Sequence, residues 1–476
     1  MRNRWSILGI AVAGLAGGCV SYQPHPLDAR AELVSLAERH LPDAVTMPSP
    51  AAGQGETATA FDPSDGLSED EAVAVALTLN TDLQASRAAI GESEALLISA
   101  KVLPNPEVGV GIRPGFMGTP GLTVDADLLF ELLKPGERSA RVGVAAAKAD
   151  ATRAEILAKE YAVATDVRRQ VFAVLVAEHV AALLTEEATL RERAVEFVRQ
   201  RRAIGEGNEL DVSAAELELV ELKRDGRLAA AELQKSRLEL NRLMGLPPSY
   251  GVHLSESGKP LTVAIFDDPT DARLQDQLLA GRLDLRAREA EYRVAEEELR
   301  LAVSKQYPSI KLGPSYQHEG VSDNYIGLGA SIELPIFDRN RGGIAEKDTA
   351  RGRVRAEYVS LLHRLTADAF AARAKARSAK AEIDTEEREV LPLLKRNQDL
   401  YRGAFEAREL SVLDWITAQQ RALRTRRAYL DSLIAYRLAV LDLDAATGLA
   451  ITRPPAGTGT EPPTPTDIPP GPTPQE

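Results

Sequence analysis

Residues 325–343 (YIGLGASIELPIFDRNRGG) constrain the fold more than any other stretch, because their character changes within a few positions. From 327 to 334 apolar residues alternate with small or polar ones, a period of two that is typical of a strand with one apolar face. Pro335 cannot donate to a strand ladder, and from Ile344 an Ala-, Glu- and Arg-rich run of about sixty residues has helical composition. The sequence therefore predicts a strand that leads into a very long helix. The apolar face of that strand would carry Leu328, Ala330, Ile332 and Leu334.

The same transition occurs about two hundred residues earlier, at 122–138 (LTVDADLLFELLKPGER). Further matches keep that spacing and the same order. They are Lys101 and Pro104 with Lys305 and Pro308, RAE at 154–156 with 355–357, Leu-Asp at 210–211 with 413–414, and Gly-Leu at 245–246 with 448–449. Such ordered self-similarity indicates an internal duplication.

The composition favours helices over a large globular core, since aromatic residues make up only 5% of the 476 residues. The net charge of −13 becomes −15 without residues 1–18, which carry Arg2, Arg4 and no acid. This acidity argues against nucleic-acid binding. The single cysteine, Cys19, excludes a disulfide framework within the chain and a cysteine-based metal site.

Residues 1–18 combine a basic start with a short apolar run, which is typical of a secretory signal peptide. The sequence LAGGC at its end resembles a bacterial lipoprotein signal, in which Cys19 becomes the lipidated N-terminus; the alternative is a plain signal peptide with an incidental cysteine. Residues 19–66 are Pro-, Ala- and Gly-rich with little periodicity, so we expect an N-terminal tether. Nine prolines after Arg453 predict a disordered or polyproline-like tail at 450–476.

Four short strands are predicted, two in each half, at 107–112, 122–130, 309–316 and 327–334. Each has one apolar face, which matches transmembrane β-strands better than the alternative, a soluble sandwich. Two hairpins cannot close a barrel, and an open strand edge is not tolerated in lipid, so several chains would contribute to one barrel. The opposite faces would meet water in its interior, with side chains that include Asp125, Asp127, Lys311 and Glu333.

The predicted helices repeat in length as well. A run at 137–204, roughly 100 Å long at ~1.5 Å per residue, is flanked by shorter runs at 67–100 and 208–245, and a run at 344–407 is flanked by 271–305 and 411–446. Ser68 and Glu71 have the spacing of a helix-capping box at the start of the first run. In each half the long helix would pack antiparallel to two short helices stacked end to end. The resulting organisation is repeat 1 at 67–250, a linker at 251–270 and repeat 2 at 271–449.

The signal-plus-cysteine start, the duplicated helix–strand–strand–helix unit, PNPE at 104–107 and LPIFDRNRGG at 334–343 together resemble the TolC-type outer-membrane efflux channels. The LPxFDRNxG form resembles the CzcC-like branch, which serves heavy-metal efflux pumps. The resemblance implies a homotrimer, with four strands per chain in a twelve-stranded outer-membrane barrel and the helices in a hollow periplasmic tunnel. It also implies two partners, a periplasmic adaptor (membrane fusion protein) and an inner-membrane pump of the RND type.

The resemblance implies that Asp414 lines the periplasmic constriction and selects cations, with Asp211 as its counterpart in the first repeat. Three carboxylates around an axis would attract cations. The alternative for both aspartates is capping of the helix that follows each turn. The sequence has Thr417 where some family members carry a second acidic ring, and Leu410 where some carry a gate-locking arginine.

The helix turns at 205–211 and 407–414 lie at the far ends of the long helices from the strands, and we expect them to receive the adaptor. The residues predicted for docking are Gly205, Gly207, Asn208, Glu409 and Ser411. No catalytic motif, cofactor motif or metal-ligand spacing is present, so we expect a passive conduit and not an enzyme. The alternative function is a lipid-anchored periplasmic coiled-coil scaffold or adaptor whose strand pairs are soluble hairpins.

Overall fold

The structure is a computed structural model that describes residues 22–41, 44–47, 57–60, 65–114, 122–259, 261, 266–319, 323–407, 409 and 411–448. The predicted signal peptide, Cys19, Leu410 and the tail at 450–476 lie outside these residues. The chain forms two compact units, Met1–His40 and Leu41–Glu476, which we describe separately.

The segment predicted as the N-terminal tether contains some regular structure. In the first unit, helix α2 (Ala29–Ala37) is capped by Asp28, whose Oδ1 accepts from the amides of Arg30 at 2.9 Å and Ala31 at 3.2 Å. In the second unit, β1 (Ala44–Met47) pairs antiparallel with β2 (Thr57–Ala60). The sequence did not predict this helix or this ladder, since a local cap and a short ladder satisfy backbone groups without strong apolar periodicity.

The order of elements in the second unit repeats, as the duplication predicted. The first half contains α3 (Glu69–Leu79), α4 (Thr81–Lys101), β3 (Glu107–Pro114), β4 (Leu122–Leu132), α5 (Glu137–Ala203) and α6 (Glu209–Met244). The second half contains α7 (Asp271–Gly281), α8 (Leu283–Ser304), β5 (Ile310–Glu319), β6 (Asp323–Ile332), α9 (Arg341–Thr385), the π-helical turn η1 (Glu386–Val390), α10 (Leu391–Glu406) and α11 (Val412–Thr447).

Three of the predicted helices are interrupted. The run at 67–100 breaks at Asn80, which caps α4 by accepting from the Leu83 amide and donates to the Leu243 carbonyl at 2.8 Å. The run at 271–305 breaks at Arg282, and the run at 344–407 contains η1. The predicted capping box at Ser68 and Glu71 is confirmed. The breaks were missed because they depend on contacts with residues distant in sequence.

Equivalent glycines end the last helix of each half in the left-handed conformation, Gly245 at φ 71° and Gly448 at φ 80°. A Cβ on Gly245 would lie 2.2 Å from the Leu79 carbonyl oxygen, and a Cβ on Gly448 would lie 2.3 Å from the Gly281 carbonyl carbon. Each glycine therefore allows α6 or α11 to end directly against a helix break of its own half.

The strands form one antiparallel sheet in the order β3-β4-β5-β6, with β3 and β6 at its edges. Leu334 lies beyond the end of β6, so the predicted last residue of that strand was wrong. A Cβ on Gly313 would lie 1.8 Å from the Leu128 carbonyl oxygen, so only glycine fits at this position between β5 and β4.

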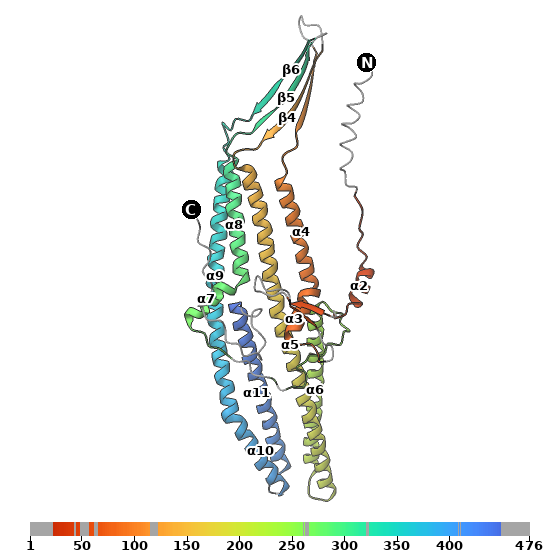
Figure 1. The fold of residues 1–476 in the computed structure, drawn as a ribbon. Coiled ribbons are helices and arrows are strands. Elements are labelled where there is room, and N and C mark those ends of the chain that lie inside the picture. Colours follow the sequence, from red (N-terminus) through yellow and green to blue (C-terminus); the bar gives the residue numbers. More distant parts are fainter. Residues whose placement is uncertain are drawn as a thin grey trace. The chain divides into compact units, whose positions relative to one another are not determined.

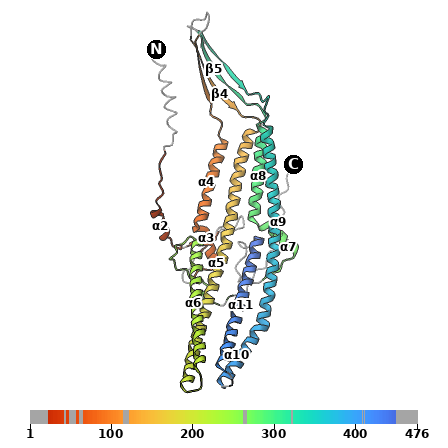
Figure 2. The ribbon, with the colours of Figure 1, turned by 180° about the vertical axis from the view of Figure 1, so that it is seen from behind.

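The 67-residue helix α5 contacts α3, α4 and α6 of its own half and α8 and α11 of the other half (Figures 1 and 2). The long helix flanked by short ones is thus confirmed, and the packing of α5 on α8 adds a contact between the halves. A buried core joins α3, α4, α5 and α6 through residues that include Leu67, Val75, Leu83, Val167, Val171, Leu240 and Met244. Among the described residues, no helix is both long and apolar enough to cross a membrane.

Candidate functional site

The turn between α5 and α6 is built by a left-handed glycine and a capping box. Gly205 has φ 78°, and its amide donates to the Arg202 carbonyl at 3.0 Å. Asn208 caps α6: its Oδ1 accepts from the Asp211 amide at 2.8 Å, and Asp211 Oδ2 accepts from the Asn208 amide at 3.4 Å. Gly207 lies within the same turn, against the backbone of Arg202. The Asp211 carboxylate therefore makes the capping contact that was the alternative to a pore role.

The turn before α11 also leads into a side-chain cap, here without a left-handed glycine among the described residues. Ser411 caps the helix, because its Oγ accepts from the Asp414 amide at 3.1 Å and donates to Asp414 Oδ2 at 2.6 Å. The Asp414 carboxylate is exposed and lies in the first turn of α11, where the helix dipole favours a negative charge. Glu409 and Thr417 are also exposed. Asp414 thus combines a capping contact with access to solvent.

A small apolar cluster brings the two turns to the same end of the helices. Val195 and Val198 of α5, Val212 and Ala215 of α6, and Ile416 of α11 are buried together. Ion pairs flank this cluster on α5 and α6, with Arg199 bound to Glu216 and Arg202 to Glu209, both at 2.5 Å. The first turns of α6 and α11, which carry the two aspartates, are therefore neighbours, as expected.

Polar contacts that the sequence did not reveal join α11 to α5 and α6 farther from the turns. Glu187 of α5 is only 4% exposed and accepts from Arg426 Nη1 of α11 at 3.1 Å. Glu218 of α6 accepts from the Gln420 side-chain amide of α11. The spacing of these residues gives no motif, because each pair joins residues more than two hundred positions apart.

The sheet has two chemically distinct faces. One face is mostly apolar along the paired positions, with His318 and Asn324 only near one end of the strands, and its large apolar side chains are exposed, with Val108 at 72% and Leu328 at 79%. The opposite face holds ion pairs, from Lys311 to Glu107 at 2.6 Å and from Arg113 to Asp125 at 2.8 Å. The predicted strand faces are confirmed, with Asp125, Asp127 and Lys311 opposite Val124, Ala126 and Ile310.

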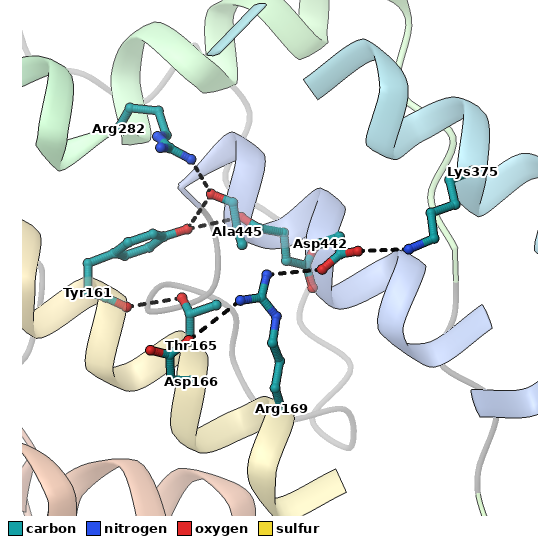
Figure 3. Close-up of polar contacts among 9 residues, drawn as sticks. Tyr161, Thr165, Asp166, Arg169, Arg282, Lys375, Asp442 and Ala445 are labelled. Carbon is teal, nitrogen blue, oxygen red and sulfur yellow. Dashed lines mark hydrogen bonds and ion pairs between the residues drawn. The ribbon is translucent and has the colours of Figure 1, made fainter. Parts of the chain in front are cut away.

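The two halves also meet where α11 ends on α5 (Figure 3). The Tyr161 hydroxyl donates to the Ala445 carbonyl at 2.8 Å, and Arg282 Nη1 donates to the same carbonyl at 2.8 Å. Burial raises the pKa of Tyr161 to about 12. Beside it, Asp442 accepts from Arg169 at 3.0 Å and from Lys375 at 3.1 Å, which links α5, α11 and α9. These contacts cap the end of α11 and fix it between the halves.

In the part of the chain that the structure describes, no group of three or more His, Cys, Asp or Glu side chains is placed to hold a metal ion. The aspartates of the two turns are instead arranged to present charge to solvent or to cap helices. A comparison with known protein families shows to which class this protein belongs. The model of the family described as outer membrane efflux protein matches residues 72–246 and 274–449.

The chain belongs to the outer membrane efflux protein family. The two matched segments lie within the two predicted repeats. Among curated relatives of this efflux protein is the cobalt-zinc-cadmium resistance protein CzcC of Cupriavidus metallidurans, which is 27% identical over 419 residues, 84% of this chain and 96% of CzcC. Solved outer-membrane channels share the fold. A CusC structure has a TM-score of 0.65 at 19% identity and covers 80% of this chain and 92% of CusC.

The open-state structure of the Neisseria gonorrhoeae MtrE outer membrane channel also has a TM-score of 0.65, at 17% identity, covering 85% of this efflux protein and 98% of MtrE. The resemblance to outer-membrane efflux channels that was based on PNPE and LPIFDRNRGG is therefore confirmed: the protein is an efflux channel of the outer-membrane family. Its family consists of channels and not enzymes, which agrees with the lack of a catalytic motif.

Proposed function

We propose that this efflux protein is the passive outer-membrane conduit of a tripartite export system. One observation carries this proposal: the four-stranded sheet presents an exposed apolar face and two free edges, beside an opposite face that holds ion pairs. A hydrophobic face of this kind is stable in lipid, whereas in water it would have to be covered. In lipid the free edges must also be paired.

Three copies satisfy both requirements. A homotrimer would pair β3 of one copy with β6 of the next and close a twelve-stranded barrel, with the apolar face toward lipid and the ion-paired face toward a water-filled interior. The periplasmic helices would continue this conduit as a tunnel. Lipidation at Cys19 would add an anchor in the outer membrane but would not carry the insertion, because a closed barrel is held by its own apolar face.

The helix turns would form the periplasmic mouth. The exposed turn residues, which include Gly205, Asn208, Glu409 and Ser411, would contact a periplasmic adaptor that joins the channel to an inner-membrane pump of the RND type. A ring of three Asp414 carboxylates, each in the first turn of a helix, would attract cations at the narrowest point. CzcC is named for cobalt, zinc and cadmium resistance, and we infer divalent heavy-metal cations as the cargo of this chain.

Asp414→Asn tests the mouth directly. The amide oxygen can still accept from Ser411 Oγ, so the cap survives while the charge is removed. We expect a weaker preference for cations, and less block by multivalent cations, in planar-bilayer recordings. The effect of Asp211→Asn should be smaller, because Asp211 is half-buried whereas Asp414 is exposed.

Asp127→Asn is the matched control in the barrel. Charges in a wide lumen are separated by more than a Debye length of ~8 Å, so salt screens them. If Asp414→Asn leaves ion selectivity unchanged, the Asp414 charge does not form the selective ring and the constriction lies elsewhere. If all three variants reduce selectivity equally, the charge of the whole lumen and not a ring at the mouth selects cations.

The second candidate is the lipid-anchored periplasmic scaffold with soluble hairpins. Only the predicted lipidation favours it, and that signal is shared with the channel. The exposed side chains of Val108, Ile326 and Leu328 argue against it, since a soluble hairpin would bury them. Detergent-dependent trimers support the channel, whereas a soluble monomer after Cys19→Ala supports the scaffold.

A further inference from the structure

Arg191 of α5 is a buried cation that lacks a bonded partner. Arg191 is only 5% exposed, and its Nη1 donates no hydrogen bond. The side chain forms no hydrogen bond or ion pair with any other residue that the structure describes. Burial lowers the pKa of its guanidinium. A buried charge without a partner is costly, so this position needs an explanation other than packing.

The two carboxylates whose charges act on Arg191 are both bonded to α11. Glu187 lies four residues earlier on the same face of α5, an arrangement in which a glutamate and an arginine can pair without a change in the backbone. In this structure Glu187 instead accepts from Arg426. Glu218 of α6 accepts from Gln420. Arg191 thus lies close to two carboxylates with which it could pair, while both carboxylates are bonded to residues of α11.

We propose that Arg191 is the alternative partner of Glu187 and Glu218, and that it takes them over when α11 moves away from α5 and α6. The inference rests on the proposed function, because release of α11 would widen the mouth. Without Arg191, that movement would leave the buried Glu187 carboxylate unpaired, at a large cost in free energy. With Arg191, each carboxylate exchanges one partner for another. The cluster therefore has two arrangements in which the carboxylates are paired.

The helix that packs against α11, formed by α9 and α10, contains a site at which it can bend. Between α9 and α10 lies the π turn Glu386–Val390, and Pro392 is the second residue of α10. Pi turns and prolines are the sites where helices bend. The corresponding helix of the first half, α5, runs through 67 residues without interruption. We therefore expect α10 and α11, which lie side by side (Figure 1), to bend at this point while α5 and α6 stay in place.

Opposite effects are expected from the two arginines. Arg191→Met removes the partner of the released state, so the fraction of time spent open should fall by about tenfold, the equivalent of one charge-assisted hydrogen bond. Arg426→Gln weakens the hold of α11 and should raise that fraction. Arg193→Met, at an exposed position on the same helix, is the matched control and should change neither. In a Glu187→Gln and Glu218→Gln background, Arg191→Met should have no further effect.

The measurements are single-channel recording and, independently, the distance between spin labels at the exposed positions Glu221 of α6 and Arg421 of α11. For the labels, both positions are changed to Cys in detergent-extracted protein that carries Cys19→Ala. Arg426→Gln should populate a longer distance, and adding Arg191→Met should remove it. If the wild type conducts no ions, the proposed function fails, yet the distances still test the exchange.

Two results would overturn the exchange of partners. One is a distance distribution that Arg191→Met leaves unchanged in the Arg426→Gln protein. The other is a loss of assembled trimer with unaltered distances, which would show that Arg191 pairs with a group of a neighbouring copy.

Discussion

Leu328→Arg places a charge near the centre of the exposed apolar face. Leu328 is 79% exposed, lies opposite Pro314 in the register, and is flanked on its own strand by Ile326 and Ala330 of the same face. An arginine at the bilayer midplane costs about 2–4 kcal/mol in a transmembrane barrel. Three copies would make this roughly 6–12 kcal/mol per assembly. We therefore expect a marked loss of heat-resistant trimer on semi-native electrophoresis, and a lower urea midpoint in detergent.

Two further variants distinguish the effect of the strand face from the effect of depth in the membrane. Ser315→Arg lies at nearly the same height on the opposite face, across from Asp127 and Gly327, and should be tolerated because it meets water. Ile332→Arg lies on the apolar face but at the last residue of β6, so its cost should be only about 0–1 kcal/mol. If Leu328→Arg and Ser315→Arg lower trimer stability equally, the assignment of the two faces is wrong.

Two other perturbations test the anchor and the junction between the halves. Cys19→Ala should abolish acylation but leave the protein in the outer-membrane fraction, since the barrel inserts by itself; recovery only from the soluble periplasm would contradict the barrel. Tyr161→Phe should lower stability at neutral pH by about 1 kcal/mol, but it should also reduce alkaline destabilisation. The pKa of Tyr161 is raised to about 12 by burial, so the stability of the wild type should fall by up to roughly 2–3 kcal/mol as pH rises from ~10 toward ~12, and this titration has no effect below pH ~10. Urea midpoints at pH 9 and 11.5 should therefore differ less in Tyr161→Phe than in the wild type, and an equal difference would contradict the assigned burial.

Local patterns predicted the four strands of the sheet, the long helices and the two strand faces. The alternation around Leu328 predicted which side chains would be exposed together, because the side-chain period of a strand is fixed by backbone geometry. The capping box at Ser68 was also predictable, because its partner Glu71 lies only three residues away.

Contacts between distant segments could not be predicted. The breaks at Asn80 and Arg282 depend on carbonyls at the ends of α6 and α11, more than 160 residues away. The buried cluster of Glu187, Arg191 and Arg426 was missed because each residue, taken alone, fits the charged face of a solvated helix. At the mouth, the sequence placed Asp211 and Asp414 at helix starts, and the structure adds their capping contacts.

The most direct test of the channel is ion conduction by the purified full-length protein across a planar bilayer. We predict stepwise, cation-preferring conductance from a detergent-dependent assembly of three copies. A protein that remains a soluble monomer without detergent, and that produces no conductance steps in the bilayer, would contradict the proposed outer-membrane conduit.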